Sequence, residues 1–139
     1  MDTITIYTDG ASRGNPGHSA SGYSIIMNGK RIAGGAKYNG NATNNFAEYN
    51  AVILALEWCR DNIASRKECA VNLYSDSELV VRQLGGVYKV KSNEMKRLNG
   101  IARALIKEFK GVRFHNLPRE DRNISAVDAR LNRLLDGGE

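Results

Sequence analysis

The spacing of hydrophobic residues changes after the first third of the chain, and this change restricts the fold more than any other feature. In the first third, hydrophobic and polar residues alternate, as they do in strands with one buried face. The pattern predicts strands at Thr3–Thr8, Ser21–Met27 and Arg31–Tyr38, the last two joined by the hairpin dipeptide Asn28-Gly29. We therefore expect three antiparallel strands at the start, with the first strand ending at Asp9 and a glycine-rich loop after it.

The rest of the chain alternates between helical and strand patterns. A mostly buried helix is predicted from about Asn45 to Asn62. It is followed by a strand at Ala70–Tyr74, a short helix from Asp76 to Gly85-Gly86, an amphipathic helix whose apolar positions run from Met95 to Phe109, a strand around Val112–His115, and a helix with Leu131, Leu134 and Leu135. A length of 139 residues allows one well-buried core. The order predicts a single α/β domain over residues 1–139, with a mixed five-stranded sheet flanked by helices.

Composition limits the environment and the partners. The net charge of +5, from 20 basic and 15 acidic residues, favours a polyanionic partner without requiring one. The longest apolar run, Ala51–Leu56, is too short to cross a bilayer, and no signal-peptide pattern follows Met1. Cys59 and Cys69 lack zinc-binding spacing and fit reduced thiols. We expect a cytoplasmic monomer with no membrane contact.

Four acidic residues lie where a predicted strand ends or a predicted helix begins, namely Asp9, Glu48, Asp76 and Asp128. Each has a structural explanation, as a turn residue, as the partner of Asn45 or Ser125 in a helix-capping box, or as a charge that favours a helix start. Taken one at a time, these explanations stay open.

The four acids together indicate something else. Strands that are neighbours in sequence usually lie side by side, so the predicted topology can bring all four carboxylates to one edge of the sheet. Carboxylates gathered in one place repel one another unless cations bind them. Mg²⁺ prefers such oxygen ligands, and two ions would offset about four negative charges. The pattern predicts a metal site suited to phosphate esters.

The segments around these acids resemble the type 1 ribonuclease H family, whose members cut the RNA strand of RNA–DNA hybrids. The family's motifs are matched in order and spacing by DGASRGNPG from Asp9, TNNFAEYNA from Thr43 and SDSELV from Ser75. The likeness covers nearly the whole chain. It implies the ribonuclease H-like fold and endonucleolytic hydrolysis that leaves a 5′ phosphate and a 3′ hydroxyl.

The resemblance also implies a role for each matching residue. Asp9 would bridge two Mg²⁺ ions, Asp128 would help hold the ion that activates water, and Glu48 and Asp76 would hold the ion that stabilises the leaving oxygen; Mn²⁺ is the alternative ion. Residues that resemble the family's hybrid contacts are Asn15, Thr43, Asn44, Asn45 and Glu78. Helix capping is the structural alternative for Asn44 and Asn45.

The segment before Asp128 departs from the family's commonest pattern. Many relatives carry a His there, whereas this chain reads LPREDRNIS, with Arg119 in that place, and resembles a branch that has Pro-Arg-Glu. Arg119 can bind a phosphate through two parallel hydrogen bonds but cannot act as a base near neutral pH. The alternative catalytic residue is His115, which is expected within the fifth strand. The Asn that usually precedes the last acid by four positions is here Asn123, five positions before it.

A second departure concerns the basic helix and loop that some bacterial members insert to grip the hybrid. The segment LGGVYKVKSNEMK is too short for that insertion. Lys89, Lys91, Lys96 and Arg97 either form a smaller phosphate-binding patch or belong to a solvated helix face.

Two other functions stay open. A DNA-cleaving relative of the integrase or resolvase type would share the fold, although such proteins usually lack the Thr-Asn-Asn and Gly-Asn-Pro-Gly segments. A catalytically silent module would bind hybrids without needing all four carboxylates. The leading prediction is a metal-dependent ribonuclease H.

Overall fold

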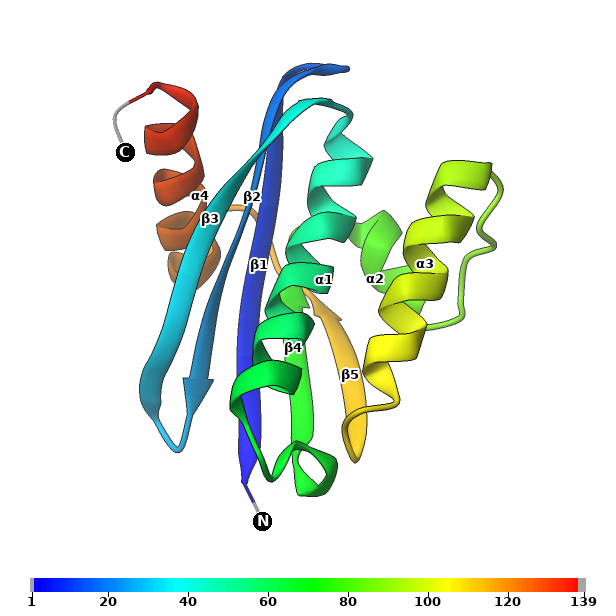
Figure 1. The fold of residues 1–139 in the computed structure, drawn as a ribbon. Helices are drawn as coiled ribbons and strands as arrows, with labels where there is room; N and C mark the ends of the chain where they lie inside the picture. The colour runs from blue at the N-terminus through cyan, green and yellow to red at the C-terminus, as the bar shows by residue number, and fades with distance from the viewer. Residues whose placement is uncertain (1, 138–139) are drawn as a thin grey trace.

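Five strands form one mixed sheet in the order β3-β2-β1-β4-β5 (Figure 1). The computed structural model describes residues 2–137, and its strands are β1 (Thr3–Gly14), β2 (Gly17–Met27), β3 (Lys30–Ala42), β4 (Ala70–Ser75) and β5 (Gly111–Asn116). The first three strands are antiparallel to their neighbours, and β4 and β5 are added in parallel beside β1. This is the predicted sheet. The ends of the predicted domain, Met1 and Gly138–Glu139, lie outside the described residues.

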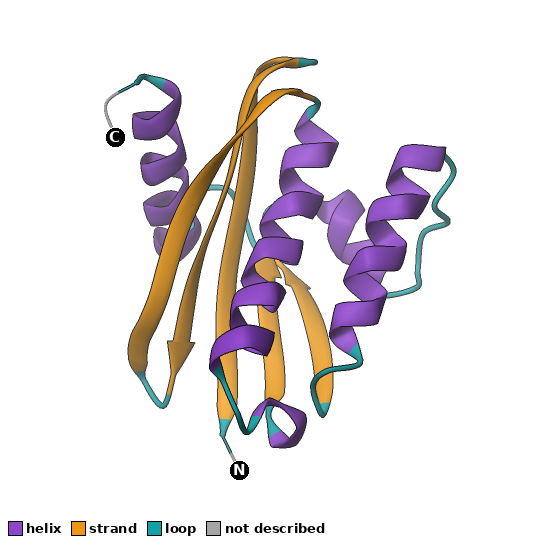
Figure 2. Cartoon of the chain, viewed as in Figure 1, coloured by secondary structure: helices purple, strands orange, loops and turns teal. Residues whose placement is uncertain are grey.

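Helices pack on both faces of the sheet (Figure 2). They are α1 (Asn44–Asn62), α2 (Glu78–Leu84), α3 (Asn93–Ile106) and α4 (Arg122–Leu135), with a short 3₁₀ turn, η1 (Arg66–Glu68), before β4. α1 packs on β1 and β2 and is flanked by α3, whereas α4 packs on β1, β2 and β3. Apart from η1, the predicted order of elements is confirmed. Within residues 2–137, the helices lack the length and hydrophobicity that a bilayer span requires.

The core lies between the sheet and α1. Ile4, Ile6 and Leu73 from the strands are fully buried, as are Val52 and Leu56 from the helix. Burying a side chain of this size stabilises the fold by about 1.5–3 kcal/mol. α1 is buried on most of its surface because the sheet covers one side and α3 another, as its broad apolar pattern predicts.

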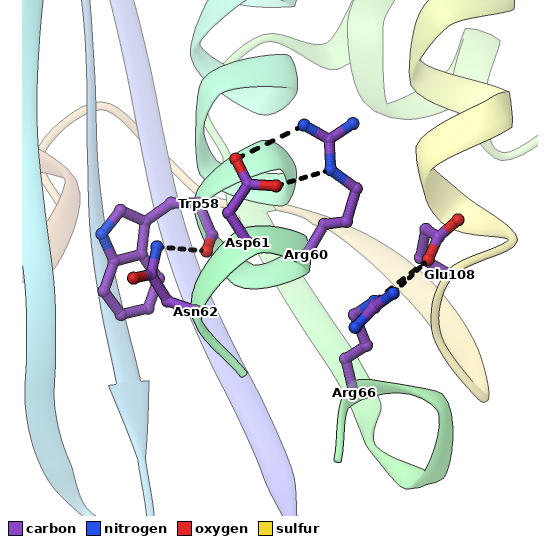
Figure 3. A network of polar contacts seen from close by, with 6 residues as sticks. All are labelled: Trp58, Arg60, Asp61, Asn62, Arg66 and Glu108. Carbon is purple, nitrogen blue, oxygen red and sulfur yellow. Dashed lines mark hydrogen bonds and ion pairs between the residues drawn. The ribbon is translucent and has the colours of Figure 1, made fainter. Parts of the chain in front are cut away.

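The end of the fold near the amino ends of β4 and β5 is held by polar contacts (Figure 3). Arg66 donates from Nε at 3.0 Å and from Nη2 at 2.9 Å to Oε1 of Glu108, and this ion pair ties η1 to the turn that follows α3. Nearby, Asn62 Nδ2 donates to the carbonyl of Trp58 at 2.9 Å, one turn back in α1. A half-buried ion pair of this kind contributes about 1 kcal/mol.

The predicted end of the first strand is wrong. β1 does not stop at Asp9 but continues to Gly14, and β2 begins at Gly17. Residues from Asp9 to Gly14 pair with β2 in register, from Asp9↔Gly22 to Gly14↔Gly17, so β2 supplies partners for the backbone of the predicted loop. Only Asn15-Pro16 forms the turn.

Three helix boundaries also differ from the prediction. α2 begins at Glu78 rather than Asp76, because Ser77 caps it by accepting from Val80 N. α3 ends at Ile106, three residues before Phe109, which still packs into the core at 7% exposure. α4 begins at Arg122, so Asp128 lies in its middle and not at its start.

Candidate active site

The site begins where β1 loses one of its two neighbours. β4 pairs with β1 only as far as Thr8↔Ser75, and from Asp9 onward β1 pairs with β2 alone. We call this unpaired side of β1 the open edge. Side chains from the two faces of the sheet can approach one another there, because no strand separates them. Asp9 is the first residue of the open edge.

Two glycines show which way the neighbouring side chains point. A Cβ on Gly10 would lie 2.4 Å from the carbonyl carbon of Ala47 and 2.5 Å from the amide nitrogen of Glu48, so Gly10 faces α1. A Cβ on Gly22 would lie 2.6 Å from Leu131 of α4, so Gly22 faces α4. Since Asp9 is paired with Gly22, Asp9 also points to the α4 face. Only glycine at position 10 lets α1 approach β1 closely enough to bring Glu48 to the open edge.

Three acids from three different elements meet at the open edge. Carboxylate oxygens of Asp9, Glu48 and Asp76 all lie within 4.8 Å of one another. Asp9 is 3% exposed, and its Oδ1 accepts from the amide of Gly10 at 3.0 Å. Glu48 Oε1 and Asp76 Oδ1 are buried and have no hydrogen-bond partner among the described residues. Leaving such oxygens unpaired costs about 1–3 kcal/mol or more each, and a divalent cation is a partner that would satisfy both.

Asp128 joins this group from α4, on the Asp9 side. It lies close enough to Asp9 to help raise the pKa of the Asp9 carboxyl. Its Oδ2 accepts from Asn132 Nδ2 at 3.0 Å, one helical turn further on. The four predicted acids are therefore neighbours, with three in a tight cluster and Asp128 at its margin. We call them the acidic cluster.

Hydrogen-bonded helix capping and turn formation account for none of the four acids. α1 is capped by Thr43, whose Oγ1 accepts from Phe46 N at 3.1 Å, and not by an Asn45–Glu48 box. α4 is capped by Asp121, which accepts from the amides of Asn123 and Ile124. Asp76 precedes the cap of α2, and Asp9 lies within a strand rather than in a turn. Packing and capping thus leave the acidic cluster unexplained.

Burial and the close spacing of the acids raise the pKa values of two of them. Burial, followed by the charge of Asp76 and contact with Asp128, raises the pKa of Asp9 from 3.8 to about 9. Burial and then the charges of Asp76 and Asp9 raise the pKa of Glu48 well above its ordinary value. The site favours protonation when no cation is bound, so a divalent cation would compete with protons there.

These pKa shifts predict how pH affects the metal-free protein. Because the pKa of Asp9 is raised in the folded state, its contribution to stability is full below about pH 4 and is lost as pH rises toward about 9. We expect the melting temperature of the metal-free protein to fall between about pH 5 and about pH 8, and Mg²⁺ to reverse most of that fall. Thermal unfolding with EDTA or with Mg²⁺ measures this, and Asp9→Asn should flatten the EDTA curve. A wild-type melting temperature that rises over this interval in EDTA would contradict the prediction.

The residues predicted to contact a hybrid surround one side of this site. Asn44 Oδ1 accepts from the amide of Ser12 at 3.0 Å, and the amide of Asn44 donates to Asn15 Oδ1 at 3.1 Å. The start of α1 and the tip of the β1–β2 hairpin are therefore bonded to each other. Glu78, at the start of α2, is exposed and accepts from Arg82 at 2.8 Å.

Asn45 lies at a hollow of about 620 Å³ where α1, α2 and the chain leading to α3 meet. Its lining includes Gln83, Tyr88, Lys89 and Lys91. Lys89 and Lys91 were expected either in a phosphate-binding patch or on a solvated helix face. They lie in the connection between α2 and α3, on the same concave surface as Asn45. A concave surface with two lysines and a tyrosine suits a nucleic-acid strand.

Two residues were considered in place of the His that many relatives carry, His115 and Arg119. The structure gives their side chains different numbers of contacts. His115 lies in β5, as predicted, where its Nε2 is 2.9 Å from Asn72 Oδ1 and its ring stacks on Tyr74 at 4.6 Å. Arg119 lies in the turn between β5 and α4, and its backbone carbonyl accepts from Ser125 Oγ. Within residues 2–137, its guanidinium forms no ion pair, so it is free to move toward a phosphate.

Sequence reasoning missed two residues that are linked to the acidic cluster by hydrogen bonds. Asn132 binds Asp128, and Arg13 binds Asn132. Asn132 had a detectable signal, since a residue four positions after Asp128 lies on the same helix face. Arg13 had none, although it stands in the DGASRGNPG segment.

Comparisons with known proteins agree with this geometry. The sequence model of the RNase H family matches residues 1–116, and the chain belongs to that family. Ribonuclease HI of Halobacterium salinarum is 37% identical over 134 residues, which cover 96% of this chain and 64% of that protein. The bifunctional protein Rv2228c of Mycobacterium tuberculosis is 33% identical over 84% of this chain but only 31% of its own length. The chain thus spans less than two thirds of either relative.

Solved structures show the same fold. The crystal structure of RNase H1 from Halobacterium salinarum NRC-1 superposes with a TM-score of 0.87 at 36% identity, covering 97% of this chain and 98% of that one. LC11-RNase H1 in complex with an RNA/DNA hybrid superposes with a TM-score of 0.89 at 37% identity, covering 96% and 97%. The predicted ribonuclease H-like fold is therefore confirmed.

Proposed function

We propose that this protein hydrolyses the RNA strand of RNA–DNA hybrids as a metal-dependent endonuclease and leaves a 5′ phosphate and a 3′ hydroxyl. The observation that carries the proposal is the meeting of Asp9, Glu48 and Asp76, from three elements, with two buried carboxylate oxygens left unpaired within the described chain. A close structural relative, LC11-RNase H1, is known in complex with an RNA/DNA hybrid, which supports the choice of substrate.

Asp9, Glu48, Asp76 and Asp128 would hold two Mg²⁺ ions, with Mn²⁺ as the alternative. When bound, these ions would supply an activated water and neutralise the charge that develops on the phosphodiester. The role of the chain is to hold the four carboxylates together against their repulsion. Buried Asp9 is influenced by the charges of both Asp76 and Asp128, which fits a residue that would help to hold both ions.

Selection of RNA requires groups that recognise a 2′ hydroxyl in a wide, shallow minor groove. The side-chain oxygens of Asn15 and Asn44 are used inside the protein, but their side-chain Nδ2 atoms have no partner within residues 2–137 and can donate to the hybrid. Glu78 uses one carboxylate oxygen for Arg82 and keeps the other to accept from a 2′ hydroxyl. Asn45, beside the lysine-lined hollow, completes this set.

Thr43 is proposed to bind a phosphate of the DNA strand. Its hydroxyl oxygen accepts from Phe46 N, which leaves the hydroxyl hydrogen to donate to a phosphate oxygen. On the RNA strand, Arg119 is proposed to stabilise phosphate charge, since its guanidinium, which forms no ion pair within residues 2–137, can form two parallel hydrogen bonds. We also propose that the chain belongs to the branch with Pro118-Arg119-Glu120 and without the basic protrusion. The connection between α2 and α3, from Gly85 to Ser92, is indeed short.

The extent of the domain over residues 1–139, the monomeric state and the cytoplasmic location remain predictions from the sequence.

The test is cleavage of three labelled duplexes of one sequence, RNA–DNA hybrid, duplex DNA and duplex RNA, each with Mg²⁺ and with EDTA. We expect the RNA strand of the hybrid to be cut only with Mg²⁺, giving fragments whose new 5′ ends are sensitive to phosphatase. Cleavage of duplex DNA at a similar rate would instead support a DNA nuclease of the integrase type. Tight hybrid binding without any cleavage would support the silent binding module.

A further inference from the structure

Arg13 and Asn132 form a polar chain that ends on the acidic cluster. Asn132 Nδ2 donates to Asp128 Oδ2 at 3.0 Å and to the Asp128 carbonyl at 3.1 Å. Its side-chain oxygen accepts from Arg13 Nη2 at 3.1 Å, and Arg13 Nη1 forms a 2.6 Å ion pair with Asp136 Oδ1. Both ends of the Asn132 amide are therefore used, which fixes its orientation.

The spacing of β1 and α4 explains why these residues meet. Asp9 and Arg13 lie four positions apart on the same face of β1, which spans about 13 Å of strand. Asp128 and Asn132 lie on one face of α4, Asp136 caps its C-terminal end one turn further on, and eight positions of helix rise about 12 Å. Figure 1 shows α4 running alongside the strands toward the tip of the β1–β2 hairpin. Asp9 thus meets Asp128 at one end of this contact, and Arg13 meets Asp136 at the other.

The two ends of the contact have opposite electrostatic character. Asp9 and Asp128 are both acids, so their contact repels unless a proton or a cation lies between them. The Arg13–Asp136 pair attracts and holds the same helix against the same strand. Asn132, between the two ends, donates to Asp128 and so limits the rotation of its carboxylate.

We propose that Arg13 and Asn132 are positioning residues that hold the Asp128 carboxylate against Asp9 for metal binding. The inference rests on the proposed function, because it assigns the pair to the proposed metal site. The pair contributes little to global stability, because the Arg13 and Asp136 side chains are 44% and 63% exposed and solvent screens their attraction. Loss of a residue that orients a metal ligand instead lowers metal affinity, about 10-fold or more.

The hairpin that carries Arg13 is also bonded to the start of α1. Ser12 Oγ donates to the Ala42 carbonyl at 2.8 Å, and the Ser12 amide donates to Asn44 Oδ1. The same hairpin therefore links a proposed substrate contact, Asn44, to a proposed metal ligand, Asp128. The DGASRGNPG segment thus contributes the contacts of Ser12 and Arg13 in addition to supplying Asp9.

The experiment is a calorimetric titration of the full 139-residue chain with Mn²⁺, without nucleic acid, on the wild type, Asn132→Ala and Arg13→Ala. We expect both variants to bind Mn²⁺ about 10-fold more weakly, with melting temperatures in EDTA within about 2 °C of the wild type. Arg13→Lys should recover part of the affinity, because it keeps the charge opposite Asp136 but loses the forked contact. Cleavage rates should recover at high Mg²⁺, since the defect is in binding.

Matched controls exist elsewhere in the chain. Asn62→Ala removes the same kind of bond one helical turn back, Asn62 Nδ2 to the Trp58 carbonyl at 2.9 Å (Figure 3), and Arg60→Ala removes an exposed ion pair with Asp61. Both should bind Mn²⁺ as the wild type does.

Two results would overturn the inference, and they are distinguishable. If wild type binds Mn²⁺, Asp9→Asn does not, and both Asn132→Ala and Arg13→Ala bind as tightly as wild type, the positioning role is wrong while the proposed function stands. If wild type takes up no Mn²⁺, the proposed function fails and this inference fails with it.

Discussion

Asp9→Asn is expected to lower the rate of hybrid cleavage by about 10³-fold or more. Asp9 is the buried acid whose pKa both Asp76 and Asp128 raise, so its replacement by Asn removes a central carboxylate from the proposed metal site. The variant should still bind hybrids, because the proposed contacts at Asn15, Asn44 and Glu78 are unchanged. Single-turnover cleavage with Mg²⁺ and hybrid binding in EDTA measure the two effects separately.

The same substitution should make the metal-free protein more stable. It removes a buried group whose charged form is disfavoured by burial and by two neighbouring acids, and we expect a gain of about 1–2 kcal/mol in the free energy of unfolding in EDTA near neutral pH. Asp61→Asn is the control, since this acid is exposed and paired only with neighbouring Arg60, and it should alter neither property. A fully active Asp9→Asn enzyme would show that the metal assignment is wrong.

Gly10→Ala is expected to lower the free energy of unfolding by about 3 kcal/mol. The added methyl group would lie 2.4 Å from the carbonyl carbon of Ala47 and 2.5 Å from the amide nitrogen of Glu48, and neither backbone atom can move without shifting α1. Because α1 carries Glu48, any protein that still folds should also lose cleavage activity. Urea unfolding followed by circular dichroism gives the stability.

Two other glycines complete a graded series. Gly22→Ala meets Leu131 at 2.6 Å, Val127 at 3.1 Å and the Gly35 carbonyl oxygen at 3.2 Å, and since only side-chain ends lie closer than 3.2 Å it should cost less, about 1–2 kcal/mol. Gly100→Ala meets nothing within 4 Å on helix α3 and should stabilise the protein by about 0.5–1 kcal/mol. If Gly10→Ala is no worse than Gly22→Ala, the close approach of β1 and α1 is not what sets the position of Glu48.

The order of elements could be predicted because periodicity is a local signal. Alternation in Thr3–Thr8 and helical spacing in Asn45–Asn62 each report on one element and its buried face. The end of β1 could not be predicted in this way. Gly10 is a turn signal in sequence, yet in the structure it serves close packing against α1, and only the position of α1 distinguishes the two uses.

The sequence predicted which acids form the site better than it predicted the contacts that position them. The four acids were expected at one place, and the structure brings them together, although their catalytic roles remain proposals. The start of α4 was misplaced because Ser125 and Asp121 are both good caps, and the path of the chain from β5 favours Asp121. The contact between Arg13 and Asp136 joins residues 123 positions apart and leaves no local pattern.

The Arg66–Glu108 pair and the acidic cluster lie at opposite ends of β4, about 17 Å apart along the strand. Changes at sites so far apart usually have additive effects on stability. Heat tolerance can therefore be raised or lowered near the amino end of β4, for instance by replacing that pair with apolar side chains, without disturbing the acidic cluster at the other end. Natural or engineered variants adapted to different temperatures can differ at this ion pair while the acidic cluster stays the same.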